Sequence, residues 1–93
     1  MHKLDVSEHL KKVLARLCKK EPYRYEMVMK KVDEILRCDD VDHYKNLRAP
    51  LQRFKRVHID THFVLTFRYN TTDDTVTFYD FDHHDSIYKK DGT

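Results

Sequence analysis

Histidine is the residue type in this sequence best suited to chemistry near neutral pH. The chain has seven histidines among 93 residues. Four of them belong to its second half: His58, His62, His83 and His84. Imidazole titrates near pH ~6.5, so a pair of such side chains can take and give a proton, as cleavage of a phosphodiester through a 2′-hydroxyl group requires. Histidines exposed on strands are also common, and that interpretation stays open.

The same cleavage needs positive charge where negative charge builds on the phosphate. Between His43 and Tyr69 the chain has six Lys or Arg residues and three histidines against one acidic residue, Asp60. This segment is a candidate surface for a polyanion, although a solvated basic face would have the same composition. The candidate phosphate-binding cations are Lys45, Arg53, Lys55 and Arg56.

A metal site is the competing interpretation of the histidines. His58 and His62 stand four residues apart, and three more candidate ligands follow later in the chain: His83, His84 and Asp85. Four-residue spacing converges on one face of a helix, but this segment has the pattern of a strand and a turn, where convergence is not assured. We therefore expect neither a metal nor another cofactor.

Length and composition predict one domain spanning residues 1–93, because so short a chain has room for one core. Hydrophobic residues make up 40% of the chain, and a single glycine leaves no flexible linker. Cys18 and Cys38 are isolated, the start of the chain is polar, and no stretch is apolar enough to span a bilayer. These features favour a reduced, cytoplasmic setting without a membrane partner.

Two amphipathic helices are expected first. Between Ser7 and Lys20 apolar residues recur at i, i+3, i+4, i+7 and i+8, and Ser7 is a suitable N-cap. The period restarts after Pro22, which can open a helix but not continue one. We expect the two helices to be antiparallel, with a short edge strand at residues 3–6 ahead of them.

The apolar period changes from 3.6 to 2 after Pro50, which predicts strands at 54–60, 62–69 and 75–81. The helices should pack on one face of these strands, while the face that carries Arg and His stays open. The side chains expected under the helices are Phe63, Leu65, Phe67, Val76 and Phe78. The expected fold class is α+β, with an N-terminal helical hairpin on a small antiparallel sheet of three to four strands.

The stretch from Lys45 to Tyr88 resembles the RelE/ParE superfamily of toxins from type II toxin–antitoxin systems, and most of all its YafQ-type branch. "KNLRAPLQRFKRVHIDTHFVLTFRY" is similar to the stretch of that branch that passes through an Arg-x-x-His-hydrophobic strand into a Leu-x-Tyr strand. "TVTFYDFDHHDSIY" is similar to the last strand of the family, followed by His-x-x-Leu-Phe or Arg-x-x-Val-Tyr. The basic helical run at residues 11–20 also fits, so the similarity covers nearly the whole chain.

The resemblance implies roles for four residues. His58 matches a strand histidine of YafQ-like toxins and would be an acid–base group, and His84 matches a histidine near the terminal aromatic and would be a general acid. Tyr88 falls on that aromatic, which would stack on the substrate or transfer a proton. His62 stands where the YafQ pattern has Asp, so it keeps a titratable group of different charge.

Two positions depart from the family pattern. Lys45 replaces a histidine and leaves only a cation, although the nearby His43 could substitute for it. Val64 replaces an arginine of RelE in the second long strand. These departures bear on catalytic efficiency more than on the fold.

By the same resemblance, the chain would be an endoribonuclease that cuts messenger RNA in the ribosomal A site without a metal. Its partners would be a cognate antitoxin, mRNA and the ribosome. Two alternatives remain open: a ParE-like inhibitor of DNA gyrase, which would lack the catalytic set, and a degenerate toxin that only binds its antitoxin.

The facing of His83 and His84 is a point of conflict. Strict alternation from Val76 and Phe78 places His83 on the open face and His84 toward the core, whereas the family match implies the reverse. A bulge or a strand end near Phe81 and Asp82 would reconcile the two, because one extra residue reverses the facing. We follow the family match and keep His83 as the alternative acid.

Overall fold

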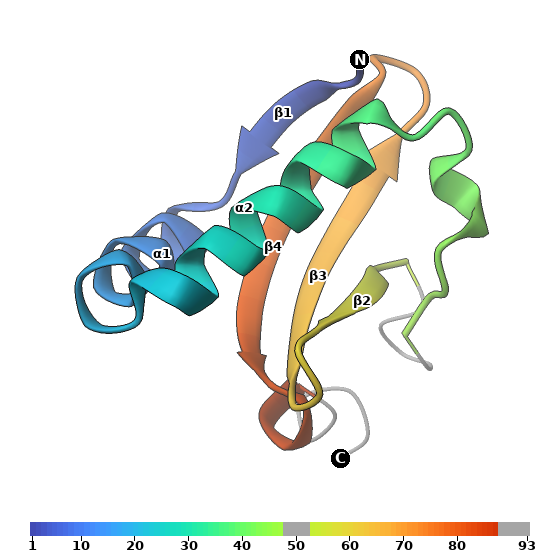
Figure 1. The fold of residues 1–93 in the computed structure, drawn as a ribbon. Helices are drawn as coiled ribbons and strands as arrows, with labels where there is room; N and C mark the ends of the chain where they lie inside the picture. The colour runs from blue at the N-terminus through green and yellow to red at the C-terminus, as the bar shows by residue number, and fades with distance from the viewer. Residues whose placement is uncertain (48–52, 88–93) are drawn as a thin grey trace.

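One strand, two helices and three further strands follow one another along the chain (Figure 1). The computed structural model describes residues 1–47 and 53–87. The elements are β1 (Lys3–Val6), α1 (Glu8–Lys20), α2 (Pro22–Arg37), a 3-10 turn (Val41–His43), β2 (Lys55–Ile59), β3 (Phe63–Asn70) and β4 (Thr75–His83). A helical turn begins at His84 and is described as far as Ile87. In this described part of the chain, no helix has the length and apolar character needed to cross a membrane.

The four strands form a single sheet in the order β1-β4-β3-β2. β2, β3 and β4 pair antiparallel in sequence, as the turn signals predicted. β1 pairs with β4 in parallel, so the sheet is mixed and not purely antiparallel as expected. A parallel edge is possible here because the chain leaves β1 through two helices and not through a tight hairpin.

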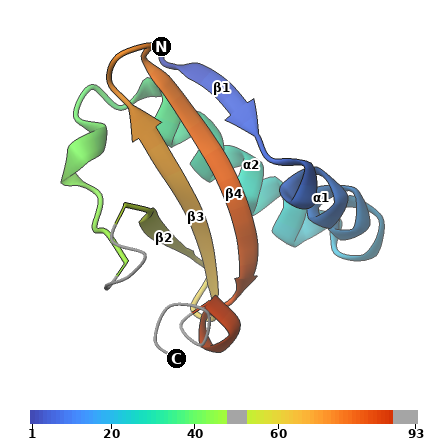
Figure 2. The same cartoon turned by 180° about the vertical axis from the view of Figure 1, so that it is seen from behind.

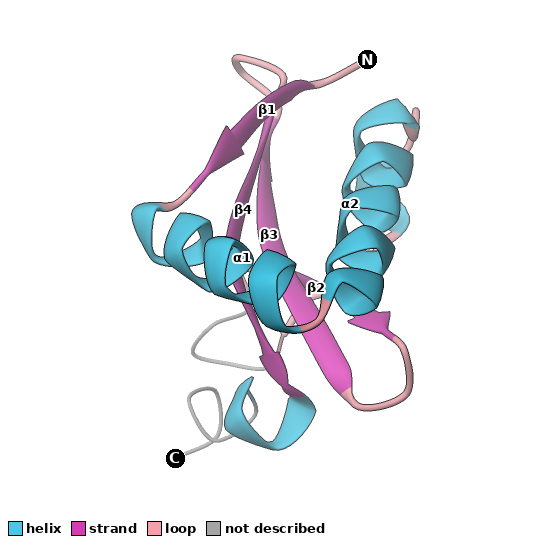
Figure 3. Ribbon diagram, turned by 60° about the vertical axis from the view of Figure 1, so that its left-hand side comes forward, coloured by secondary structure: helices cyan, strands magenta, loops and turns pink. Residues whose placement is uncertain are grey.

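The two helices begin where the sequence predicted. The Ser7 Oγ accepts a hydrogen bond from the Leu10 N–H at 3.0 Å, which caps α1, and donates one to the Tyr79 carbonyl at 2.8 Å, which ties the cap to β4. Pro22 occupies the first turn of α2. Figure 3 shows the helices diverging from their junction instead of lying antiparallel along their lengths, because α1 packs on β4 and α2 reaches β2.

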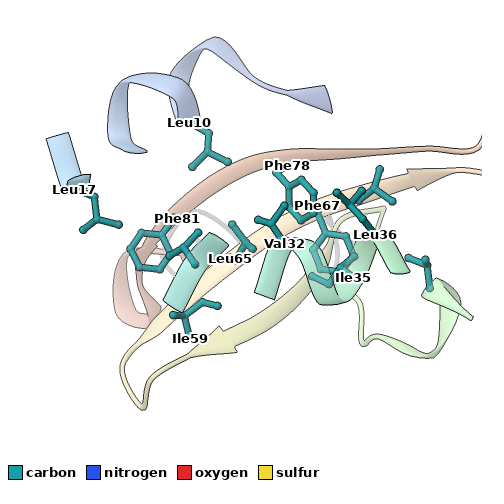
Figure 4. Packing of buried hydrophobic residues seen from close by; sticks show 13 residues of the cluster. Leu10, Leu17, Val32, Ile35, Leu36, Ile59, Leu65, Phe67, Phe78 and Phe81 are labelled. Carbon is teal, nitrogen blue, oxygen red and sulfur yellow. The ribbon is translucent and has the colours of Figure 1, made fainter. Parts of the chain in front are cut away.

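Both helices cover the same face of the sheet, and Figure 2 shows the opposite face. Between helices and sheet lies one hydrophobic core, drawn in Figure 4. The expected strand residues Leu65, Phe67, Val76 and Phe78 are all fully buried in it, and Phe63 packs against its edge. On α1 the fully buried leucine is Leu10.

Candidate functional site

The β2–β3 hairpin places His58 on the face of the sheet opposite the helices. Val57 and Ile59 contribute to the core beneath the helices. Because side chains alternate along a strand, Arg56 and His58 project from the other face. His58 is exposed and stands opposite Val64 of β3. The sequence therefore predicted the facing of this strand correctly.

A β-bulge on β4 decides how the last two histidines face. Thr66 pairs with Asp80 while Phe67 pairs with Phe78, so Tyr79 is an extra residue on β4. The extra residue returns Phe81 to the core face, where it is buried. The break in alternation that the family match required is therefore present, two residues earlier than the position considered from the sequence.

After the bulge, His83 faces the helix side of the sheet. Its ring meets the ring of Phe63 edge-on, with centroids 5.7 Å apart, and Phe63 stacks on Phe81 at 5.2 Å. His84 follows as the first residue of the terminal helical turn. The alternation of β4 ends at His83, so it does not set the direction of the His84 side chain.

His62, His83 and His84 come together at one end of the sheet. The His84 N–H donates to the His62 carbonyl at 2.8 Å, which joins the end of β4 to the turn between β2 and β3. The ring centroids are 4.7 Å apart for His83 and His84, 5.9 Å for His62 and His83, and 6.3 Å for His62 and His84. We call these three residues the histidine cluster; His58 stands on β2, which β3 separates from β4.

The turn that carries His62 is anchored to α2. Asp60 has a positive φ of 57°, and its Oδ1 accepts a 2.8 Å hydrogen bond from the Thr61 N–H. The Thr61 hydrogen bonds, with a smaller contribution from the charge of Arg24, hold the pKa of Asp60 below its usual value. The Arg24 guanidinium on α2 lies 3.6 Å from Asp60 and 4.3 Å above the Phe63 ring. These contacts fix the hairpin end on which the cluster is built.

Arginines surround a second, smaller apolar cluster on the open face. Leu47, Val64 and Ile87 are buried there, and Phe54 packs against them. The guanidinium groups of Arg53 and Arg68 lie 5.3 and 5.9 Å from the centre of the Phe54 ring. Val64, which the family resemblance matches to an arginine of RelE, is therefore buried in this small apolar cluster and is not exposed on the basic surface.

Arg68 was not among the sequence candidates. It projects from the same face as Thr66, two residues earlier on β3, and Thr66 pairs with Arg56 of β2. Diagonal neighbours on one face of a sheet are within reach of long side chains. The alternation of β3 already indicated this facing, so the strand pattern was the signal that could have identified Arg68 as a site residue.

Lys55 does not lie on this surface. The residue is 8% exposed, and its Nζ donates to the Tyr44 carbonyl at 3.2 Å and to Asn46 Oδ1 at 3.1 Å. It also lies 3.6 Å from Asp42 Oδ1. Lys55 therefore holds the 42–46 loop against β2, which removes it from the candidate phosphate ligands; the count of basic residues could not distinguish these roles.

Three other candidates have different surroundings. Lys45 is exposed, and its carbonyl accepts a hydrogen bond from the Arg56 N–H at 2.9 Å. His43 contacts its own loop, with its Nδ1 3.7 Å from the Cys38 Sγ. Tyr88 lies outside the residues that the structure describes.

A cavity of about 220 Å³ opens beside the arginines. Its lining includes the aromatic rings of Phe54 and Tyr79, which meet edge-on with centroids 5.1 Å apart. Leu47 and Ile87 add apolar walls, and Thr66 and Asp80 add polar groups. Such a lining suits a flat, partly apolar group such as a nucleobase.

A pair of helices on one face of a four-stranded sheet, with His58, Arg56 and Arg68 on the other face, agrees with the α+β fold that the sequence resemblance implied. No family model matches the chain. Over 90 residues it is 47% identical to a protein of Methanocaldococcus jannaschii named "Putative toxin RelE4", and the match covers 97% of this chain and 94% of that relative. The chain therefore belongs to the RelE superfamily of toxins from toxin–antitoxin systems.

Solved structures share the fold. A metal-bound toxin from Helicobacter pylori superposes with a TM-score of 0.73 at 18% identity, over 94% of this chain and 99% of that one. The isolated RelE toxin of E. coli gives a TM-score of 0.70 at 15% identity, over 97% of this chain and 98% of that one. YafQ of E. coli gives a TM-score of 0.60 at 13% identity, over 95% of this chain and 99% of that one. An E. coli RelE mutant in complex with an antitoxin RelBc peptide gives a TM-score of 0.62 at 17% identity, over 96% of this chain and 92% of that one.

Proposed function

We propose that this toxin is an endoribonuclease that cleaves messenger RNA by metal-independent acid–base chemistry. The single observation that carries the proposal is the bulge at Tyr79. It returns Phe81 and His83 to the helix side, and we take His84, the next residue, to face the side from which His58 and Arg56 project. That arrangement combines two imidazoles with fixed cations, which is what attack by a 2′-hydroxyl requires.

In the proposed reaction His58 accepts the proton of the 2′-hydroxyl as its oxygen attacks the adjacent phosphorus. His84 gives a proton to the departing 5′-oxygen, which leaves a 2′,3′-cyclic phosphate and a free 5′-hydroxyl. β2 and β4 flank β3, and His58 stands opposite Val64, which stands opposite Asp82, so the backbones of His58 and Asp82 are about 10 Å apart. His84 follows two residues after Asp82, which leaves room for a phosphodiester between the two histidine side chains. His62 would adjust the charge beside His84.

The arginines supply the positive charge in this mechanism. Arg53, Arg56 and Arg68 would hold the phosphates, with Lys45 at the margin, and a base would enter the cavity beside Phe54 and Tyr79. Tyr88 is kept as a stacking or proton-transfer residue on the family match alone. The proposed partners are mRNA on the ribosome and a cognate antitoxin. The structure of a RelE mutant in complex with an antitoxin peptide supports the antitoxin.

The proposal is tested on ribosomes programmed with a defined mRNA. His58→Ala and His84→Ala should each lower the cleavage rate by about two to four powers of ten, because each removes one general acid or base. His83→Ala should cost much less and serves as the matched control next to His84. Wild-type cleavage by both His58→Ala and His84→Ala would contradict the mechanism.

A second candidate is a toxin fold that binds its antitoxin without cleaving RNA. The apolar burial of Val64 favours it, because the arginine of RelE is absent from that position. A wild-type chain that binds antitoxin but cleaves no mRNA would support this candidate. Inhibition of DNA gyrase by the same preparation, measured as lost supercoiling, would instead support the ParE-like alternative.

A further inference from the structure

The histidine cluster has the composition of a metal site. Each of His62, His83 and His84 offers one ring nitrogen, and these three atoms lie within 4.8 Å of one another. Two separate segments supply them, and the hydrogen bond from the His84 N–H to the His62 carbonyl holds those segments together. The metal site considered from the sequence combined His58 and His62 with His83, His84 and Asp85; the fold brings His62, His83 and His84 together, and His58 is not part of the group.

We propose that His62, His83 and His84 bind a zinc ion. Zinc bonds to imidazole nitrogen are ~2.0–2.1 Å long, so tetrahedral ligand atoms lie about 3.3 Å apart. Closing the present separation needs only side-chain rotation, because His62 is exposed and the other two are half-buried. Three imidazoles without a carboxylate oxygen select zinc over magnesium or calcium, and a fourth position stays open to water.

Asp85 completes the surroundings of this site. Its Oδ1 lies 3.0 Å from the Nδ1 of His84, and its Oδ2 lies 3.7 Å from the Nδ1 of His83. A carboxylate that accepts a hydrogen bond from one ring nitrogen orients the imidazole and leaves the other nitrogen to the metal. Asp85 thus directs the Nε2 of His84 toward the ion.

Zinc in this site would inhibit RNA cleavage, a consequence that rests on the proposed function. An imidazole nitrogen that ligates zinc has its lone pair in the metal bond and cannot carry a proton. His84 cannot then protonate the 5′-oxygen. The same residues would serve as a zinc site or as acid–base groups, but not as both at once.

The binding test is calorimetric titration of Zn²⁺ into the full chain without an affinity tag. We expect one ion per chain, and His83→Gln should weaken binding by at least about tenfold, since even lost outer-shell partners cost that much. His43→Gln is the matched control, because His43 lies 3.7 Å from the Cys38 sulfur, the other place where zinc could bind. It should leave the affinity unchanged.

Absence of zinc binding, or binding lost in His43→Gln and kept in His83→Gln, would overturn the site. If His83→Gln does not fold, as judged by circular dichroism, His62→Gln provides the same test. The second measurement compares mRNA cleavage with and without saturating zinc. Inhibition that weakens in His83→Gln is expected, whereas zinc binding without inhibition would overturn the regulatory part. A wild-type chain that binds zinc but cleaves nothing would contradict the proposed function and still support the site.

Discussion

Leu10 and Leu14 on α1 provide a matched test of how the helices pack on the sheet. They are the same residue type, one helical turn apart on one helix. Leu10 is 0% exposed in the core, whereas Leu14 is half-buried at its edge. Substitution of each by alanine changes the helix propensity equally, so the difference between the two variants reports burial alone.

The expected magnitudes follow from this difference. Truncation of a fully buried leucine removes the equivalent of about three CH₂ groups at ~0.8 kcal/mol each and leaves a cavity. Leu10→Ala should therefore lower the free energy of unfolding by about 3 to 5 kcal/mol. Leu14→Ala loses about half of the transfer free energy and opens no closed cavity, so about 1 kcal/mol is expected.

Urea unfolding followed by circular dichroism measures both variants against the wild type. In a chain of this size each kcal/mol corresponds to about 4–8 °C in Tm, so Leu10→Ala should melt at least about 12 °C lower. Equal losses from Leu10→Ala and Leu14→Ala, or a loss below about 1 kcal/mol from Leu10→Ala, would refute the packing described here.

Three more predictions concern His2 near the N-terminus, the metal independence of RNA cleavage, and the 42–46 loop that Lys55 holds. The His2 ring bonds Asp74 Oδ1 and the Cys38 carbonyl, both at 2.6 Å, which raises the pKa of His2, chiefly through Asp74. The contribution of protonated His2 to the free energy of unfolding is therefore complete below pH ~6.5 and is lost as the pH rises through the raised pKa. His2→Gln should destabilise the chain more at pH 6 than at pH 9, as measured by urea unfolding. Equal losses at the two pH values would contradict this. RNA cleavage should persist in EDTA, and activity that disappears on chelation and returns with zinc would show that the metal is required. Lys55→Met should lower the free energy of unfolding by about 1–3 kcal/mol, because it leaves acceptors of the 42–46 loop unpaired. The control Lys45→Met, at an exposed residue, should change it by no more than about 0.5 kcal/mol. Similar losses for both variants would count against a structural role of Lys55.

The two proposals for the histidines make opposite demands on His84. As a general acid it must exchange a proton, and as a zinc ligand it must not. EDTA and zinc therefore give opposite expectations in one cleavage assay: chelation preserves the rate, and added zinc lowers it. This opposition makes the assay informative about both proposals.

Local patterns in the sequence were sufficient for the elements and for most of their faces. The 3.6 period with Ser7 and Pro22 predicted both helices, because capping and proline geometry act within a few residues. The period of 2 predicted which residues of β2 and β3 enter the core, since alternation is a property of the strand itself. The order of short motifs was enough to indicate the superfamily.

Features that depend on contacts between distant segments were decided by the tertiary structure. The parallel pairing of β1 depends on where the two helices carry the chain, and the bulge at Tyr79 depends on the register of β4 against β3. Lys55 looked like a free cation in the sequence, but a loop ten residues earlier uses its amino group. His62 meets His83 and His84 only because a hairpin end and a strand end coincide, and no spacing along the chain encodes the distance between ligands more than twenty residues apart.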